Sequence, residues 1–118
     1  MKKIILLLVP LLILSCKKNQ LGGTSTIKGT VLHHERFIAN ATVYIKFNSK
    51  DFPGTDVSKY DANVAADASG NYSLKCYKGD YYLYGVGYDP EIKEPVTGGI
   101  PIHIRNHETV NTDVPVTE

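Results

Sequence analysis

The stretch that decides the fold is DASGNYSLKC, residues 67–76, in which a turn runs directly into a strand. Aspartate at the start of a turn bonds the backbone that follows it, and glycine accepts the positive φ that a tight turn needs. After the turn, Tyr72, Leu74 and Cys76 alternate with Ser73 and Lys75. A period of two with one apolar face is typical of a strand in an antiparallel sheet.

The same alternation recurs on both sides of this stretch, and no window of eleven residues carries a helical stripe. About seven short strands with one apolar face each are what two packed antiparallel sheets require. The sequence therefore predicts an all-β fold, a seven-stranded antiparallel β-sandwich over residues 26–118. The other six strand segments are expected at residues 26–31, 41–47, 63–66, 81–86, 100–105 and 110–116.

Two connections between these strands are long. Residues 48–62 contain Phe52-Pro53-Gly54, and residues 89–99 contain Asp-Pro and Glu-Pro pairs. Loops of this length in a compact domain are usually functional or mobile. A tight hairpin turn is expected at residues 78–80.

Four short motifs resemble the signatures of carboxypeptidase-regulatory-like domains. They are IKGTV at 27–31, IANATV at 38–43, DASGNYSL at 67–74 and GDYYL at 79–83. The resemblance covers about residues 25–88 and implies a transthyretin-like (prealbumin-like), seven-stranded Greek-key β-sandwich. This fold is reused as an accessory module, so the resemblance says little about function.

The N-terminus has the pattern of a cleaved signal peptide. Met1-Lys2-Lys3 is followed by an apolar run from Ile4 to Leu14, which is too short to span a bilayer as a helix. Residues 13–16, Ile-Leu-Ser-Cys, resemble the bacterial lipobox. The resemblance implies that residues 1–15 are removed and that Cys16 becomes a lipidated N-terminus, with a plain secretory signal as the alternative.

This anchor implies a cell-envelope location, with the membrane as a partner through the lipid. An Asp directly after the lipidated cysteine resembles an inner-membrane retention signal, and this chain has Lys17 at that position. The outer membrane is therefore favoured, and both its periplasmic face and its surface face stay open. Residues 16–25 are polar and contain glycine, which predicts a flexible tether between the lipidated cysteine and the sandwich.

Charge and residue chemistry argue against several function classes. The formal net charge is +1, without the clusters of Lys and Arg that nucleic-acid binding needs. The histidines at 33, 34, 103 and 107 lack the spacing of metal ligands and are expected to be solvated surface residues. No serine lies in a G-x-S-x-G motif, and Cys76 is expected to be an inert buried thiol. The chain is therefore expected to be no enzyme, with no metal and no cofactor.

The strongest surface feature is aromatic. If Tyr81 and Leu83 face the core, then Tyr82 and Tyr84 face outward, and Tyr44 faces outward on its own strand. Such tyrosines form a flat platform on which a sugar ring or a protein partner stacks. The alternative is that they are cross-strand pairs that stabilise a half-exposed sheet.

Two functional hypotheses follow. The first is a lipid-anchored, non-catalytic β-sandwich module of the cell envelope that contacts an envelope protein or a glycan. The second is a periplasmic protein that binds a small ligand or a metal through the 48–62 and 89–99 loops.

Overall fold

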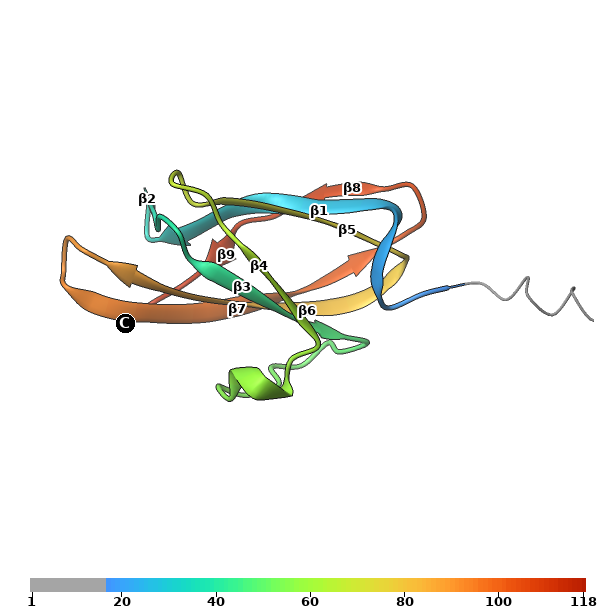
Figure 1. Ribbon diagram of the computed structural model, residues 1–118, viewed down its shortest axis with the longest axis horizontal. Coiled ribbons are helices and arrows are strands. Elements are labelled where there is room, and N and C mark those ends of the chain that lie inside the picture. The colour runs from blue at the N-terminus through green and yellow to red at the C-terminus, as the bar shows by residue number, and fades with distance from the viewer. Residues whose placement is uncertain (1–16) are drawn as a thin grey trace, which may run out of the picture.

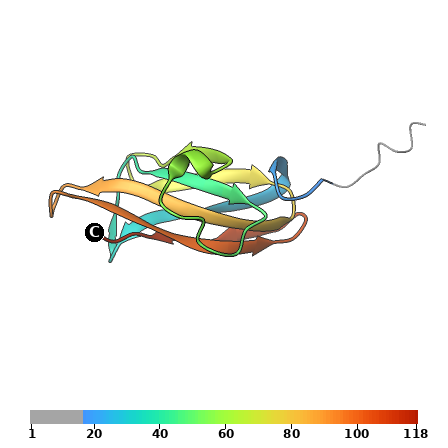
Figure 2. The same cartoon turned by 90° about the horizontal axis from the view of Figure 1, so that it is seen from below.

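The structure, a computed structural model, describes residues 17–118, and strands dominate it. Two sheets pack face to face (Figures 1 and 2), so the expected all-β sandwich is confirmed. The one helical element of these residues is a 3-10 turn, η2 (Val57–Lys59), so no helix among them is long and apolar enough to cross a membrane. The expected signal peptide, residues 1–15, and Cys16 lie outside the described residues.

The first sheet is organised around β1 (Leu21–His33). This strand pairs antiparallel with β5 (Asn71–Cys76) and β2 (Arg36–Phe37), and in parallel with β8 (Thr109–Asn111) and β9 (Val114–Pro115). The expectation of seven antiparallel strands is therefore wrong: the described chain has nine strand segments, and this sheet is mixed. The reason is that β2, β8 and β9 are only two or three residues long, too short for a period of two to reveal their partners.

The second sheet has the order β4-β3-β6-β7 and is antiparallel throughout. Its strands are β4 (Ala62–Ala65), β3 (Thr42–Phe47), β6 (Gly79–Asp89) and β7 (Glu94–Ile104). The longest pairing, between β6 and β7, runs from Gly79 opposite Ile104 to Asp89 opposite Glu94.

The core lies between the sheets and comes from the residues that the alternation placed inward. It is made of aliphatic side chains with a few aromatic ones, because β-branched and aromatic residues pack well on a pleated surface. Its largest fully buried side chain is Tyr81, and Cys76 is buried as expected. The other main contributors are Ile27, Val31, Val43, Ile45, Leu74, Leu83, Val96, Ile104 and Val114.

The turn at residues 67–71 has the predicted chemistry. Asp67 Oδ1 accepts hydrogen bonds from the backbone N–H groups of Ser69 (2.8 Å) and Asn71 (2.9 Å). Gly70 has a φ of +77°, and a Cβ at this position would lie 3.1 Å from the backbone nitrogen of Ile38. Glycine therefore suits this position for two reasons: it adopts the positive φ, and it leaves room for the close approach of Ile38.

The prediction of a second long loop over residues 89–99 is wrong, because β7 already begins at Glu94. Asp89 closes a short turn: its Oδ1 accepts from Glu91 N (2.9 Å), its backbone oxygen accepts from Lys93 N (2.8 Å), and Lys93 has a φ of +57°. The Glu94-Pro95 pair indicates a loop, but Pro95 lies on β7, the last strand in the sheet order, where a missing N–H is tolerated.

The tether expected over residues 16–25 is shorter than predicted, since β1 already begins at Leu21. The backbone N–H of Asn19 donates to Lys78 O (2.8 Å), and Gln20 O accepts from Tyr81 Oη (3.0 Å). Residues 78–80 also differ from expectation, because β5 and β6 belong to different sheets. This connection is a corner between the sheets and not a hairpin turn.

The molecule is elongated, and its two ends differ. Residue 17 joins one end, whereas the β6–β7 turn and the C-terminus lie at the other (Figure 1). We call these the entry end and the far end.

Candidate functional site

The three tyrosines that the sequence singled out lie together on the outer face of the second sheet. Tyr44 on β3 pairs directly with Tyr84 on β6, and Tyr82 lies two residues before Tyr84 on the same face. Their outward orientation therefore follows the prediction. Their exposure does not: Tyr82 is 9% exposed and Tyr84 is 3% exposed, so neither is part of an open platform.

The segment that covers them is the first long loop, residues 48–61 (Figure 2). The Phe52 ring centroid lies 5.8 Å from that of Tyr82 and 5.5 Å from that of Tyr84. Tyr60 stacks on Tyr84 with centroids 5.6 Å apart and planes 17° apart, and its ring lies 6.1 Å from Tyr44. We call these five side chains the aromatic cluster. A partner-binding role for its three tyrosines stays a prediction.

Hydrogen bonds hold the covering segment in place. Tyr60 Oη donates to Gly54 O (2.9 Å), which closes the segment on itself. Asp56 accepts from Ser58 N (3.0 Å) and so caps η2. At the end of the segment, Asp61 Oδ2 accepts from the backbone N–H of Phe47 (2.7 Å). The covering segment is therefore held in a defined position against the sheet.

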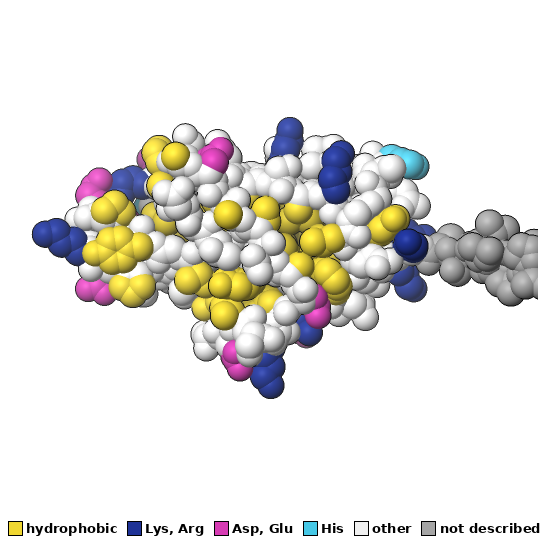
Figure 3. All heavy atoms as spheres, in the orientation of Figure 1, with side chains coloured by type: hydrophobic (Ala, Val, Ile, Leu, Met, Phe, Trp, Pro, Cys, Tyr) yellow, Lys and Arg dark blue, Asp and Glu magenta, His cyan; other side chains and the backbone are white. Residues whose placement is uncertain are grey.

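Beside the cover, on the β7 side, the sheet surface is hollowed. The hollow has a volume of about 400 Å³. Figure 3 shows apolar side chains gathered where the covering segment projects from the sheet. The two regions named in the ligand-binding alternative meet here, although only the first is a loop. The lining residues are Phe52, Thr55, Tyr82, Tyr84, Thr97, Gly98 and Gly99.

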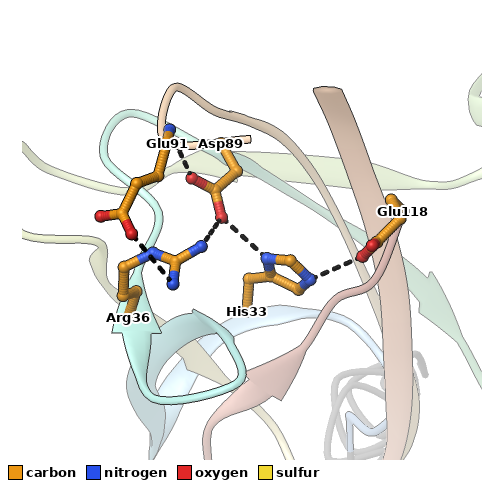
Figure 4. Close-up of polar contacts among 5 residues, drawn as sticks. All are labelled: His33, Arg36, Asp89, Glu91 and Glu118. Atoms are coloured by element: carbon orange, nitrogen blue, oxygen red, sulfur yellow. Dashed lines mark hydrogen bonds and ion pairs between the residues drawn. The ribbon is translucent and has the colours of Figure 1, made fainter. Parts of the chain in front are cut away.

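A polar cluster at the far end was missed by the sequence reasoning (Figure 4). His33, expected as a solvated histidine, is 2% exposed, and its Nδ1 lies 2.7 Å from Oδ2 of Asp89, which is 1% exposed. His33 Nε2 lies 2.7 Å from Glu118 Oε1. Arg36 donates to the same Asp89 oxygen (2.5 Å) and lies 3.5 Å from Glu91.

The charges of this cluster stabilise each other. The hydrogen bond with Asp89, together with the contact to Glu118, raises the pKa of His33 above its ordinary value. The pKa of Asp89 is lowered to about 2, first by the hydrogen bond from His33 and then by those from Glu91 N and Arg36. A protonated imidazole between two carboxylates donates from both ring nitrogens, so His33 has no free nitrogen with which to act as a base or a metal ligand.

A signal for this cluster was present in the alternation. His33 continues the inward parity of Ile27 and Val31, and Asp89 continues the inward parity of Tyr81 and Leu83. Extending each strand to its observed end predicts that both side chains point inward. A buried His and a buried Asp each require a hydrogen-bond partner, and each can serve as the partner of the other.

The other histidines are exposed, as expected. His103 lies 2.9 Å from Asp80, and His107 Nδ1 lies 2.8 Å from Thr24 Oγ1. Within residues 17–118, no group of three His, Cys, Asp or Glu side chains is placed to hold a metal ion. Burial raises the pKa of the Cys76 thiol, which disfavours the reactive thiolate.

Comparison with solved structures finds this fold in proteins of distant sequence. A DUF3823 family protein from Bacteroides ovatus matches with a TM-score of 0.53 and 23% identity, over 79% of this chain and 45% of that chain. A DUF3823 family protein from Parabacteroides merdae matches with a TM-score of 0.52 and 16% identity, over 79% and 45%. The major pilin subunit of Bacillus cereus matches with a TM-score of 0.54 and 15% identity, over 81% and 30%.

These matches show a shared β-sandwich fold. The chain spans less than half the length of each of the three proteins. Comparison of the sequence with models of known families and with curated proteins finds no match.

Proposed function

We propose that this chain is a lipid-anchored, non-catalytic module of the bacterial cell envelope, built as a transthyretin-like, carboxypeptidase-regulatory-like β-sandwich. Its work is to contact an envelope protein or a glycan. The lipid is attached at Cys16 after removal of residues 1–15, and the proposed membrane is the outer membrane.

The observation that carries this proposal is the small number of residues between Cys16 and the fold. Asn19 already hydrogen-bonds to Lys78, so only residues 17 and 18 separate the lipobox cysteine from the sandwich. Three extended residues span at most about 10 Å. A lipid on Cys16 therefore holds the entry end near the membrane surface, where Lys17 and Lys18 meet anionic headgroups.

The far end is then turned away from the membrane. Phe37, Tyr88 and Ile92 are among the exposed large apolar side chains, and they come from β2, β6 and the β6–β7 turn. Figure 3 shows apolar and charged side chains mixed over this end. Such a surface suits contact with another macromolecule.

A non-catalytic role is supported by how the reactive side chains are used. Within residues 17–118, no serine or cysteine hydrogen-bonds to a histidine. The one buried histidine, His33, has carboxylates on both ring nitrogens. The likeness to DUF3823 family proteins and to a pilin subunit fits a structural module.

The test is lipid attachment in the bacterial host. The wild-type protein is expected in the detergent phase after phase separation, with a mass that corresponds to a chain beginning at an acylated Cys16. Cys16→Ala is expected to move the protein to the aqueous phase. Cys76→Ala is the matched control, because it removes the other cysteine, which is buried, and is expected to leave partition unchanged. Equal partition of wild type and Cys16→Ala contradicts the proposal.

A further inference from the structure

Among the four tyrosines of the aromatic cluster, Tyr60 alone hydrogen-bonds through its hydroxyl to one of residues 17–118. Tyr60, Tyr72 and Tyr81 each donate to a backbone carbonyl. The hydroxyls of Tyr82 and Tyr84 make no hydrogen bond to any of residues 17–118, and the two residues as a whole are 9% and 3% exposed. A phenol hydroxyl both donates and accepts, so these two groups can hydrogen-bond to a molecule that lies beside them.

Both tyrosines line the hollow beside the covering segment. One wall is Phe52, which is 52% exposed and tilted by 47° and 48° to the two tyrosine rings. Gly98 and Gly99 on β7, which have no side chains, form another part of the lining. A Cβ at Gly99 would lie 2.6 Å from Tyr82 Cε1, so glycine lets this ring lie against the strand.

The chemistry of the lining selects a class of ligand. It combines aromatic rings with the hydroxyls of Thr55 and Thr97, and it contains no charged side chain. A pyranose ring has an apolar C–H face that stacks on an aromatic ring, and a rim of hydroxyls that both donate and accept hydrogen bonds. The volume of about 400 Å³ lies within the range of small-molecule sites. A phosphate or carboxylate ligand would find no cation here.

We propose that this hollow binds a neutral pyranose ring of a glycan. Phe52 stacks on the apolar face of the sugar, and the hydroxyls of Tyr82 and Tyr84 hydrogen-bond to sugar hydroxyls. This inference rests on the proposed contact function, and it names the partner and the place of contact.

The test uses the full chain, purified in a detergent without a sugar headgroup. Calorimetric titration is made with five neutral hexasaccharides, of glucose (β-1,4 and α-1,4), mannose, xylose and N-acetylglucosamine, and with the acidic hexagalacturonate. At least one neutral oligosaccharide is expected to bind, and more tightly than the acidic one. Phe52→Ala is expected to weaken binding about five- to tenfold through loss of stacking. Tyr84→Phe keeps the ring and is expected to weaken binding about three- to tenfold through loss of one hydrogen bond.

Tyr77→Phe is the control, because Tyr77 lies at the entry end, where its N–H donates to Gln20 O (2.9 Å), outside the hollow, and its change should leave affinity unaltered. Circular dichroism of each variant separates lost binding from lost folding. Absence of binding by every neutral oligosaccharide overturns the inference, as does tighter binding of the acidic one. Binding that is unchanged in Phe52→Ala and Tyr84→Phe overturns this site but leaves a glycan-contact function standing elsewhere on the molecule. Failure of the proposed lipid anchor would appear separately, in the Cys16 experiment.

Discussion

His33 Nδ1 lies 2.7 Å from Asp89 Oδ2, and this buried contact joins the last residue of β1 to the last residue of β6. The two strands belong to different sheets, so the pair connects the sandwich across its core at the far end. Both side chains take positions that apolar residues occupy elsewhere along the same strands. Their charges therefore make stability depend on pH in two separate ranges.

The alkaline range is set by His33. Its pKa in the folded protein is raised above the ordinary 6.5, so the folded state binds this proton more tightly than the unfolded state. The stabilisation is complete below pH 6.5 and is lost as the pH rises through the raised value. We expect urea denaturation between pH 5.5 and about 9 to show a falling free energy of unfolding. His33→Gln should be less stable at pH 5.5 and should lack this fall, and a flat wild-type profile would contradict the assignment.

The acidic range is set by Asp89. Its pKa is lowered from 3.8 to about 2, so its stabilisation is present above pH 3.8 and is lost as the pH falls towards 2. We expect the wild-type melting temperature to drop steeply over this interval. Asp89→Asn should be less stable at neutral pH and should show a shallower drop. An equally steep drop in Asp89→Asn would show that another carboxyl group dominates acid unfolding.

The cover over the tyrosines depends on Phe52. Phe52→Ala removes the ring that packs on Tyr82 and Tyr84, so both should become more exposed. The chain has no tryptophan, so second-derivative absorbance reads the tyrosines directly. We expect a shift towards solvent-exposed tyrosine and a loss of about 1 kcal/mol in the free energy of unfolding. Phe37→Ala, which changes an equally exposed phenylalanine outside the hollow, should give no such shift.

The entry end depends on Tyr81. Its hydroxyl lies 3.0 Å from Gln20 O and 2.7 Å from Tyr77 O, and it is fully buried. Tyr81→Phe should cost about 1–2 kcal/mol and speed amide hydrogen exchange in residues 19–25. The exposed change Tyr88→Phe should leave both unaltered. Unchanged exchange in Tyr81→Phe would mean that other contacts hold the entry segment.

The parallel pairing of β1 with β8 and β9 depends on the absence of a side chain at Gly29. An added Cβ would lie 1.7 Å from Thr112 O, a backbone atom, so the main chain itself would have to shift. Gly29→Ala should therefore cost at least about 2 kcal/mol. Lys28→Ala, at the neighbouring exposed position, should change stability by no more than about 0.5 kcal/mol. Equal melting temperatures for the two variants would contradict the observed pairing.

The sequence predicts the inner face of the sandwich well and its outer face poorly. Alternation placed Ile27, Val43, Leu74 and Tyr81 in the core because each strand has its own period of two. The same alternation oriented Tyr82 and Tyr84 outward, but it carries no information on what covers them. Their burial depends on Phe52 and Tyr60, whose contacts with the sheet come from a segment without periodicity.

Two other differences have local causes. Asp-Pro and Glu-Pro pairs suggested a loop over residues 89–99, because proline breaks ladders in central strands, whereas β7 is the last strand in its sheet. His33 and Asp89 lie beyond the ends of the expected strands, at residues 31 and 86, so the sequence predicts neither of them in the core. Burial of either side chain requires the other as its partner, and the two partners lie 56 positions apart in the chain.

The most direct test of the account is the mass of the protein's N-terminal peptide, purified from envelopes of its own host. We predict a peptide that begins at Cys16 and carries acyl chains on that residue, with residues 1–15 absent. An unmodified Cys16, or a chain that retains residues 1–15, would contradict the lipid-anchored module proposed here.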